Sequence, residues 1–515
     1  MCGKYVITKV FKYNPAADQS PIFKVYKVPW KEKLTVLEVL RYINDNIEPL
    51  SFRYSCRSGM CGRCGVQVDG DPKLACTTLV EPGKQIVIEP LRGFPIVKDL
   101  IVDFSYVEQR DFQTAHYLQR VTLPTEQPEI INYKSHQLCS ELMKCRSCYL
   151  CQSACPVVNL AWGRFSGPAI RAKLALRAYD PRDDEGYRLR QLVREGLWLC
   201  STCLKCEEVC PVGIDVMDLT VKNMREMIVA KGLPIPDGYR RLVEKAVKTG
   251  RILEPEKEPL LITSPDLIKV KDPVLRVGFF TGCMFDYMFQ NVAKAALRVL
   301  EKNSVEIVLP KEQVCCGMPM FLSGQSKVAE QFVKQNVKVF EDANVDIVIT
   351  MCSSCIAAWR KYVPKVAEQI LGRQPEFEVL DIHDFLVNKV NLDAKEMVQI
   401  ISKVTYHDPC HLKRGAGIYK EPRMLIKMIP GIEFVEMKEA DKCCGGFLRF
   451  NEPQLADRIG KIKGELIRDS EANIVATACP LCVNQLRIVT KKIGLQNIEV
   501  LNVVELLERA YLDNK

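Results

Sequence analysis

The chain has 515 residues, 24 of them cysteine, with 72 Lys and Arg against 63 Asp and Glu and a formal net charge of +9. Cysteine is too dilute for a short disulfide-rich secreted scaffold, in which it usually exceeds about 8–10% of residues. The first ten residues, MCGKYVITKV, predict no signal peptide, and no apolar run predicts a membrane segment. The cationic residues are dispersed, so nucleic-acid binding is not indicated. We expect a cytoplasmic protein whose reduced thiols bind metal.

The first predicted domain, residues 1–104, contains two alternating strands at 5–10 and 23–28, a helix at 34–47, and a cysteine-rich loop. The loop has the spacing C-x4-C-x2-C, and a fourth cysteine follows after eleven intervening residues, which is typical of plant-type ferredoxins. Gly59, Gly62 and Gly65 would let the backbone approach the sulfurs closely. We therefore predict a β-grasp (α+β) domain with one 2Fe-2S cluster. Zinc is the alternative, although it usually binds two C-x2-4-C pairs. The predicted ligands are Cys56, Cys61, Cys64 and Cys76.

The second predicted domain, residues 105–235, contains the motif C-x2-C-x2-C-x3-C-P twice, at 145–156 and 200–211. In proteins with two clusters, the fourth cysteine of each such motif ligates the other 4Fe-4S cluster. Residues 168–197, between the motifs, have helical composition, so we predict an α-helical ferredoxin domain. The predicted ligands are Cys145, Cys148, Cys151 and Cys210 for one 4Fe-4S cluster, and Cys155, Cys200, Cys203 and Cys206 for the second.

Residues 1–230 resemble the iron-sulfur subunits of the succinate dehydrogenase and fumarate reductase family. The resemblance is carried by residues 55–62, 74–76 and 94–100 and by both four-iron motifs. It implies a flavoprotein partner that carries FAD and interconverts fumarate and succinate. One departure is Cys203, because family members usually have another residue there and a three-iron cluster. This departure puts direct quinone chemistry in doubt.

The remainder contains an internal repeat after a proline-rich linker predicted at 236–272. We place the repeats at 273–395 and 396–515. Between the first cysteine and the adjacent Cys-Cys pair lie 31 residues in the first repeat and 32 in the second. Between the glycine after that pair and the next cysteine lie 34 and 33 residues. Predicted strands alternate with helices, which favours two parallel α/β domains with cysteines on loops at the strand ends. The repeated cysteines are Cys283, Cys315, Cys316, Cys352 and Cys355, and Cys410, Cys443, Cys444, Cys479 and Cys482.

These repeats resemble the cysteine-rich (CCG) domains of heterodisulfide reductase catalytic subunits and, more loosely, those of lactate and glycolate oxidase iron-sulfur subunits. The first resemblance implies that the five cysteines of each repeat hold a noncubane 4Fe-4S cluster. An ordinary cubane with one spare cysteine, or structural zinc, remains open. His407 and His411 flank Cys410 and are candidate proton donors or hydrogen-bond partners of a cluster. Cys2 and Cys139 lie outside every pattern and are predicted to be ordinary thiols.

Nearly the whole chain resembles the iron-sulfur B subunits of the thiol:fumarate reductase family of methanogenic archaea. That resemblance implies oxidation of coenzyme M and coenzyme B thiols to their heterodisulfide. Electrons would pass through two 4Fe-4S clusters and one 2Fe-2S cluster to the FAD of the flavoprotein partner, which reduces fumarate to succinate. Three alternatives stay open: an iron-sulfur protein of a quinone-linked succinate dehydrogenase, one of a hydroxyacid oxidase, and an iron-sulfur scaffold without activity.

Overall fold

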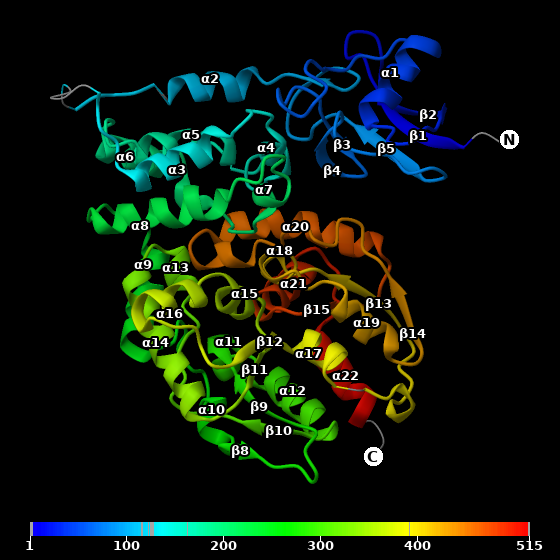
Figure 1. Cartoon of the computed structure of the whole chain (residues 1–515). Helices are drawn as coiled ribbons and strands as arrows, with labels where there is room; N and C mark the ends of the chain where they lie inside the picture. Colours follow the sequence, from blue (N-terminus) through cyan, green and yellow to red (C-terminus); the bar gives the residue numbers. More distant parts are fainter. Residues whose placement is uncertain are drawn as a thin grey trace. The chain divides into compact units, whose positions relative to one another are not determined.

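The computed structural model describes residues 4–114, 117–121, 123, 128–161, 163–390 and 392–512 (Figure 1). The chain forms two compact units. The first comprises residues 1–200 and 205–227, and the second comprises residues 201–204 and 228–515. The short segment Ser201–Leu204, in the middle of the second four-iron motif, thus belongs to the second unit.

A five-stranded sheet with the order β2-β1-β5-β3-β4 opens the first unit. Its strands are β1 (Tyr5–Lys12), β2 (Ile22–Pro29), β3 (Gly65–Val68), β4 (Asp71–Leu74) and β5 (Gln85–Glu89). The first two strands pair antiparallel and α1 (Val36–Asn46) follows them, which confirms the two predicted strands and the helix. Thr35 and Glu38 form a capping box that starts α1, and one face of the helix enters the core of this sheet.

The rest of the first unit is mostly helical, as the composition of residues 168–197 predicted. A two-stranded ribbon, β6 (Ile96–Lys98) and β7 (Ile101–Val102), precedes the helices. Both four-iron motifs contain a short helix that ends before the motif's proline, which cannot continue a helix. The helical elements are α2 (Ser105–Gln113), α3 (Tyr133–Met143), α4 (Leu150–Ala154), α5 (Pro168–Tyr179), α6 (Glu185–Arg194), η1 (Leu197–Leu199), α7 (Lys205–Glu208), η2 (Asp218–Lys222) and α8 (Asn223–Ala230).

The first repeat is built on a sheet with the order β12-β11-β9-β10-β8, in which only β8 runs antiparallel to its neighbour. Its strands are β8 (Leu267–Ile268), β9 (Leu275–Phe280), β10 (Val305–Val308), β11 (Ile347–Thr350) and β12 (Glu378–Asp381). The proline-rich segment before it contributes α9, α10 and β8. The helices are α9 (Asp237–Thr249), α10 (Leu260–Thr263), α11 (Gly282–Tyr287), α12 (Gln290–Lys302), α13 (Met318–Leu322), α14 (Ser326–Asp342), α15 (Ser353–Lys361), α16 (Val363–Leu371) and α17 (Ile382–Asn388).

The second repeat has a fully parallel sheet with the order β14-β13-β15-β16 (orange to red in Figure 1). Its strands are β13 (Ser402–His407), β14 (Ile432–Val435), β15 (Ile474–Thr477) and β16 (Glu499–Asn502). The helical elements are η3 (Ala394–Glu396), α18 (Cys410–Ala416), α19 (Glu421–Met428), η4 (Gly446–Phe450), α20 (Pro453–Asp469), α21 (Pro480–Lys492) and α22 (Val503–Leu512). The alternation of strands and helices predicted for both repeats is confirmed.

Helix α20 contains Leu455, Ile459, Ile462 and Leu466, which recur with helical spacing and so indicate a helix there. Ile462 is 38% exposed, whereas Lys463 is completely buried. Contacts with α21 and the preceding loop decide which side of the helix is covered. Among the described residues, no helix combines the length and apolarity needed to cross a bilayer.

Candidate metal centres

The predicted two-iron loop wraps its cysteines with backbone amides that point at sulfur. The amides of Ser58 and Cys61 lie 3.5 and 3.2 Å from Cys56 Sγ, and the amide of Gly59 lies 3.2 Å from Cys76 Sγ. The bonds from Ser58 and Cys61 lower the pKa of Cys56 to about 6. Backbone amides that face sulfur stabilise thiolates, the form in which cysteine binds iron.

Two of the three predicted glycines have the backbone conformation that the loop requires. Gly59 and Gly62 have φ of 77° and 68°, in the left-handed region that favours glycine. Gly65 is instead the first residue of β3, where a Cβ would press on Leu91 and Leu150. It is needed for close packing and not for a left-handed turn.

Gly62 also brings the two-iron loop against the first four-iron motif. A Cβ on Gly62 would lie 2.7 Å from Cys148 Cβ and 3.0 Å from the carbonyl oxygen of Arg146. The two cysteine loops of the first unit are therefore in direct contact through a residue without a side chain.

One pocket of the first unit gathers all four cysteines predicted for the first 4Fe-4S cluster. Cys145, Cys148, Cys151 and Cys210 line it, together with apolar residues of α5 and of the segment after Cys210. Cys206, which the motif assigns to the other cluster, lines the same pocket. The two motifs thus meet through cysteines from both copies.

Both four-iron motifs share an unusual backbone. The residues two and four positions after the first cysteine have positive φ: Ser147 (49°) and Tyr149 (58°) in the first motif, and Thr202 (56°) and Leu204 (62°) in the second. A left-handed residue other than glycine costs roughly 1–2 kcal/mol, so such residues cluster at functional sites. Alternating conformations of this kind turn successive amides toward one anion. Residue spacing alone missed this feature, because no glycine marks it.

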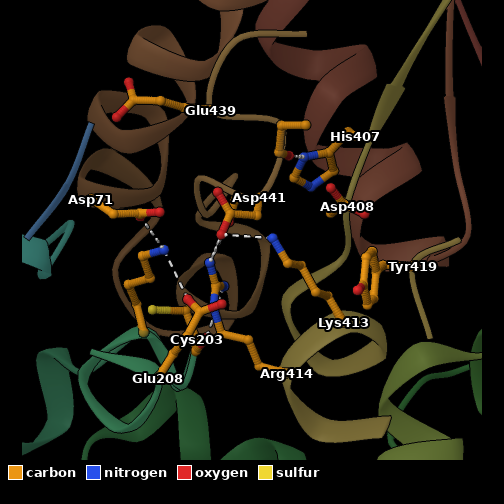
Figure 2. A network of polar contacts seen from close by, with 12 residues as sticks. Asp71, Cys203, Glu208, His407, Asp408, Lys413, Arg414, Tyr419, Glu439 and Asp441 are labelled. Atoms are coloured by element: carbon orange, nitrogen blue, oxygen red, sulfur yellow. Dashed lines mark hydrogen bonds and ion pairs between the residues drawn. The ribbon is translucent and has the colours of Figure 1, made fainter. Parts of the chain in front are cut away.

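The four cysteines predicted for the second 4Fe-4S cluster belong to both units: Cys155, Cys200 and Cys206 to the first, Cys203 to the second. Within the second unit, Arg414 of α18 donates to the carbonyl of Cys203 at 3.2 Å and to the Asp441 carboxylate at 2.6 Å. Figure 2 shows Lys413 and Arg414 both reaching Asp441. These contacts hold both the segment 201–204 and the loop before Cys443 against helix α18.

All five cysteines of the first repeat are buried, and their thiols lie close enough to shift one another's pKa. Such pairs are Cys283 with Cys315, Cys315 with Cys316, Cys316 with Cys355, and Cys355 with Cys352. The neighbouring thiols of Cys315 and Cys355 lower the pKa of Cys316 to about 6. Three neighbouring parallel strands explain this gathering, because β10, β9 and β11 each end shortly before one group of these cysteines.

The second repeat has the same arrangement around one pocket. Cys410, Cys443, Cys444, Cys479 and Cys482 all line it, and Cys444 Sγ lies 3.5 Å from Cys482 Sγ. Strands β13, β14 and β15 each precede one of the three cysteine groups. Ser201, Thr202, Ser353 and Ser354 supply most of the remaining polar lining.

The two histidines that flank Cys410 have different surroundings. His411 is engaged at both ring nitrogens: Nε2 lies 2.9 Å from the Thr202 carbonyl oxygen and Nδ1 lies 3.0 Å from Ser354 Oγ. Because a carbonyl only accepts, Nε2 carries the proton and Ser354 donates to Nδ1. Burial lowers the pKa of His411, so it is neutral near pH 7. His407 Nδ1 lies 3.1 Å from the carbonyl oxygen of Ala440, and Figure 2 shows the imidazole with this contact as a dashed line. A proton-donor role for either residue stays a prediction.

The pockets of the two repeats are neighbours within the second unit. Ser353 Oγ donates to the carbonyl of Ala478, the residue before Cys479, at 2.9 Å. Ser354 contacts His411, as described above, and both serines lie between the two cysteines of the first repeat's C-x2-C motif. The serines therefore join the cysteine loops of the two repeats.

The donor sets of these pockets suit iron-sulfur clusters. Soft thiolate ligands in buried sites are the ligands that such clusters use. Five gathered sulfurs are one more than tetrahedral zinc accepts. Cys139, by contrast, lines neither of these pockets; its partly buried thiol donates to the carbonyl of Leu176 at 3.6 Å, and its role as an ordinary thiol stays a prediction. Cys2 lies outside the described residues.

Three family models of known proteins match separate parts of the chain. Residues 7–109 match the family model of a 2Fe-2S iron-sulfur cluster binding domain, and residues 141–214 match that of a 4Fe-4S dicluster domain. Residues 277–359 and 404–487 each match the cysteine-rich domain named CCG.

Three curated relatives span different parts of the chain. The B subunit of fumarate reductase (CoM/CoB) from Methanothermobacter marburgensis is 37% identical over 98% of this chain and 99% of its own length. The D subunit of the dihydromethanophenazine:CoB–CoM heterodisulfide reductase from Methanosarcina acetivorans is 31% identical over 67% of this chain and 88% of its own. The fumarate reductase iron-sulfur subunit of Mycobacterium tuberculosis is 35% identical over 41% of this chain and 87% of its own.

The cysteine pockets and the three kinds of matched domain define a multidomain iron-sulfur protein, the electron-transferring subunit of an oxidoreductase. Because the similarity to the first relative extends over nearly all of both chains, the chain belongs to the family of fumarate reductase (CoM/CoB) B subunits.

Proposed function

We propose that this chain oxidises coenzyme M and coenzyme B thiols to their heterodisulfide in its second unit and delivers the electrons to a flavoprotein partner that reduces fumarate. The observation that carries this proposal is the gathering of five cysteines in each repeat, all of them buried except the partly buried Cys410, with the two cysteine loops joined by Ser353 and Ser354. Two adjacent sulfur-rich sites would let two thiols meet closely enough to form one bond.

The proposed reaction is balanced between the two ends of the enzyme. The two thiols lose their S–H protons and two electrons as one S–S bond forms. Fumarate gains two electrons and two protons and becomes succinate. No other oxidant or reductant is needed.

We assign the ligands as the spacing predicts: one 2Fe-2S cluster, two 4Fe-4S clusters and a noncubane 4Fe-4S cluster in each repeat. When bound, the clusters would supply one-electron carriers in series, and the irons of the repeats would also favour thiolate binding. FAD would belong to the flavoprotein partner.

The chain's own residues hold the cysteine loops close to one another. Arg414 and His411 hold segment 201–204, which includes Cys203, against the second repeat's cysteine loops. Gly62 lets the two-iron loop and the first four-iron loop touch. Close spacing of this kind is what successive one-electron transfers require.

The test is anaerobic purification with iron and sulfide counting, followed by fumarate reduction driven by the two thiols in the presence of the flavoprotein partner. We expect about 18 irons per chain, from one two-iron and four four-iron clusters. Cys444→Ser should abolish thiol-driven activity, whereas Cys139→Ser, outside all five sites, should keep it. About ten irons in the wild-type chain, or full thiol-driven activity in Cys444→Ser, would refute the proposal.

A further inference from the structure

The two repeats differ at one position beside their cysteines. Cys283 and Cys410 are equivalent and lie 127 residues apart, and three residues before them stand Phe280 and His407. Each is the last residue of its strand, β9 or β13. The Phe280 ring packs against Phe340 and Trp359, so this position of the first repeat offers no ligand atom. In the second repeat the same position holds an imidazole that is only 1% exposed.

The hydrogen bonds around Ala440 determine which nitrogen of His407 carries the proton. The Ala440 carbonyl accepts from the Lys463 ammonium at 2.8 Å and from the amide of Asp408 at 3.1 Å. His407 Nδ1 lies 3.1 Å from the same oxygen. A carbonyl cannot donate, so Nδ1 must carry the hydrogen. In the neutral ring, Nε2 then presents a lone pair.

The imidazole lies beside two of the cysteines. A ring nitrogen of His407, Cys444 Sγ and Cys482 Sγ all lie within 4.8 Å of one another, and all three residues are buried. Because Nδ1 is bonded to the Ala440 carbonyl, Nε2 is the nitrogen available for ligation. In the part of the chain that the structure describes, Nε2 makes no hydrogen bond of ordinary geometry, and the Cys444 thiol is its polar neighbour. Burial of a ring nitrogen without a hydrogen-bond partner costs free energy, unless a bound ligand or metal ion interacts with that nitrogen. An imidazole whose Nδ1–H is bonded to a carbonyl is the usual arrangement of a histidine that ligates metal through Nε2.

We propose that His407 Nε2 is a nitrogen ligand to an iron of the second repeat, on the side of Cys444 and Cys482, and that the first repeat has no such ligand. This inference rests on the proposed function, because it requires iron in the pocket. A hydrogen bond from His407 to a cluster sulfide is the competing role; it needs a proton on both ring nitrogens, whereas ligation needs one on Nδ1 alone, which the Ala440 carbonyl accepts. The two cysteine-rich sites would then differ chemically, one bound by sulfur alone and the other by sulfur and nitrogen.

The test is pulsed electron paramagnetic resonance on the anaerobic holoprotein, with and without ¹⁵N-labelled histidine, in both the oxidised and the one-electron-reduced state of the second repeat's cluster. Two states that differ by one electron include one with an unpaired spin. We expect a directly bound histidine nitrogen to couple to that spin and to change with the label. The coupling should disappear in His407→Phe, which copies the first repeat, and persist in His411→Asn, a change in the same pocket.

The outcomes separate this inference from the proposed function. Full iron content with no histidine coupling in the labelled wild-type protein would overturn the ligand assignment and leave the proposed function standing. A coupling that survives His407→Phe would also overturn it. About ten irons per chain, with no cluster signal from the second unit, would overturn the proposed function and the assignment with it. The wild-type measurement decides the first and third outcomes even if the variants do not fold.

Discussion

Substitution of Gly62 by alanine tests the contact between the two cysteine loops of the first unit. The backbone at Gly62 has φ of 68°, and a Cβ there would lie 2.7 Å from Cys148 Cβ. The left-handed conformation alone costs alanine about 1 kcal/mol. Overlap with a cysteine that must stay in its loop adds roughly 1–3 kcal/mol. We therefore expect Gly62→Ala to destabilise the first unit by about 2–4 kcal/mol.

Gly83→Ala is the matched control, because Gly83 has φ of 77° and nothing within 4 Å of its added Cβ. It carries the backbone cost without the overlap. The assay is loss of the visible circular dichroism of the 2Fe-2S cluster with urea under anaerobic conditions. With a slope of about 2 kcal/mol per molar urea, the midpoint of Gly62→Ala should fall roughly 0.5–1.5 M below that of Gly83→Ala. Equal urea midpoints for the two variants would show that the Cβ of an alanine at position 62 does not overlap Cys148. The two loops would then not be in contact there.

Three further changes test the second unit. Lys463→Met removes the two hydrogen bonds that the buried Lys463 ammonium donates to the loop before the Cys-Cys pair, and should lower the free energy of unfolding in urea by about 1–3 kcal/mol. Lys461→Met, on the exposed side of α20, should lower it by less than about 0.5 kcal/mol. Arg414→Ala should speed loss of iron to a chelator severalfold, because it releases the segment 201–204; an unchanged rate would contradict that role. After iron removal, mild oxidation should link Cys444 to Cys482, whose sulfurs lie 3.5 Å apart; peptide mapping that finds both thiols free would count against the pocket geometry.

In two of the sites, cysteines that the spacing groups together line one pocket, and their role as ligands stays a prediction. The five cysteines of the second repeat line one pocket, and so do Cys145, Cys148, Cys151 and Cys210. The reason is that a short spacing restricts a loop to few conformations, and parallel strands bring their carboxyl ends to one edge of a sheet. The strands of both repeats were predictable for the same local reason, since a short run of apolar residues suits a buried strand.

Tertiary structure decided what each single side chain does. The helical spacing of apolar residues indicates α20, but it does not show that Lys463 is buried and Ile462 partly exposed, because the neighbouring elements decide which side of the helix is covered. His407 and His411 flank the same cysteine in sequence and look interchangeable. Residues far away in the chain, Ala440 for one and Thr202 for the other, determine which nitrogen carries a proton. Hydrogen bonds over such sequence separations follow from the folded arrangement of loops, and no local pattern encodes them.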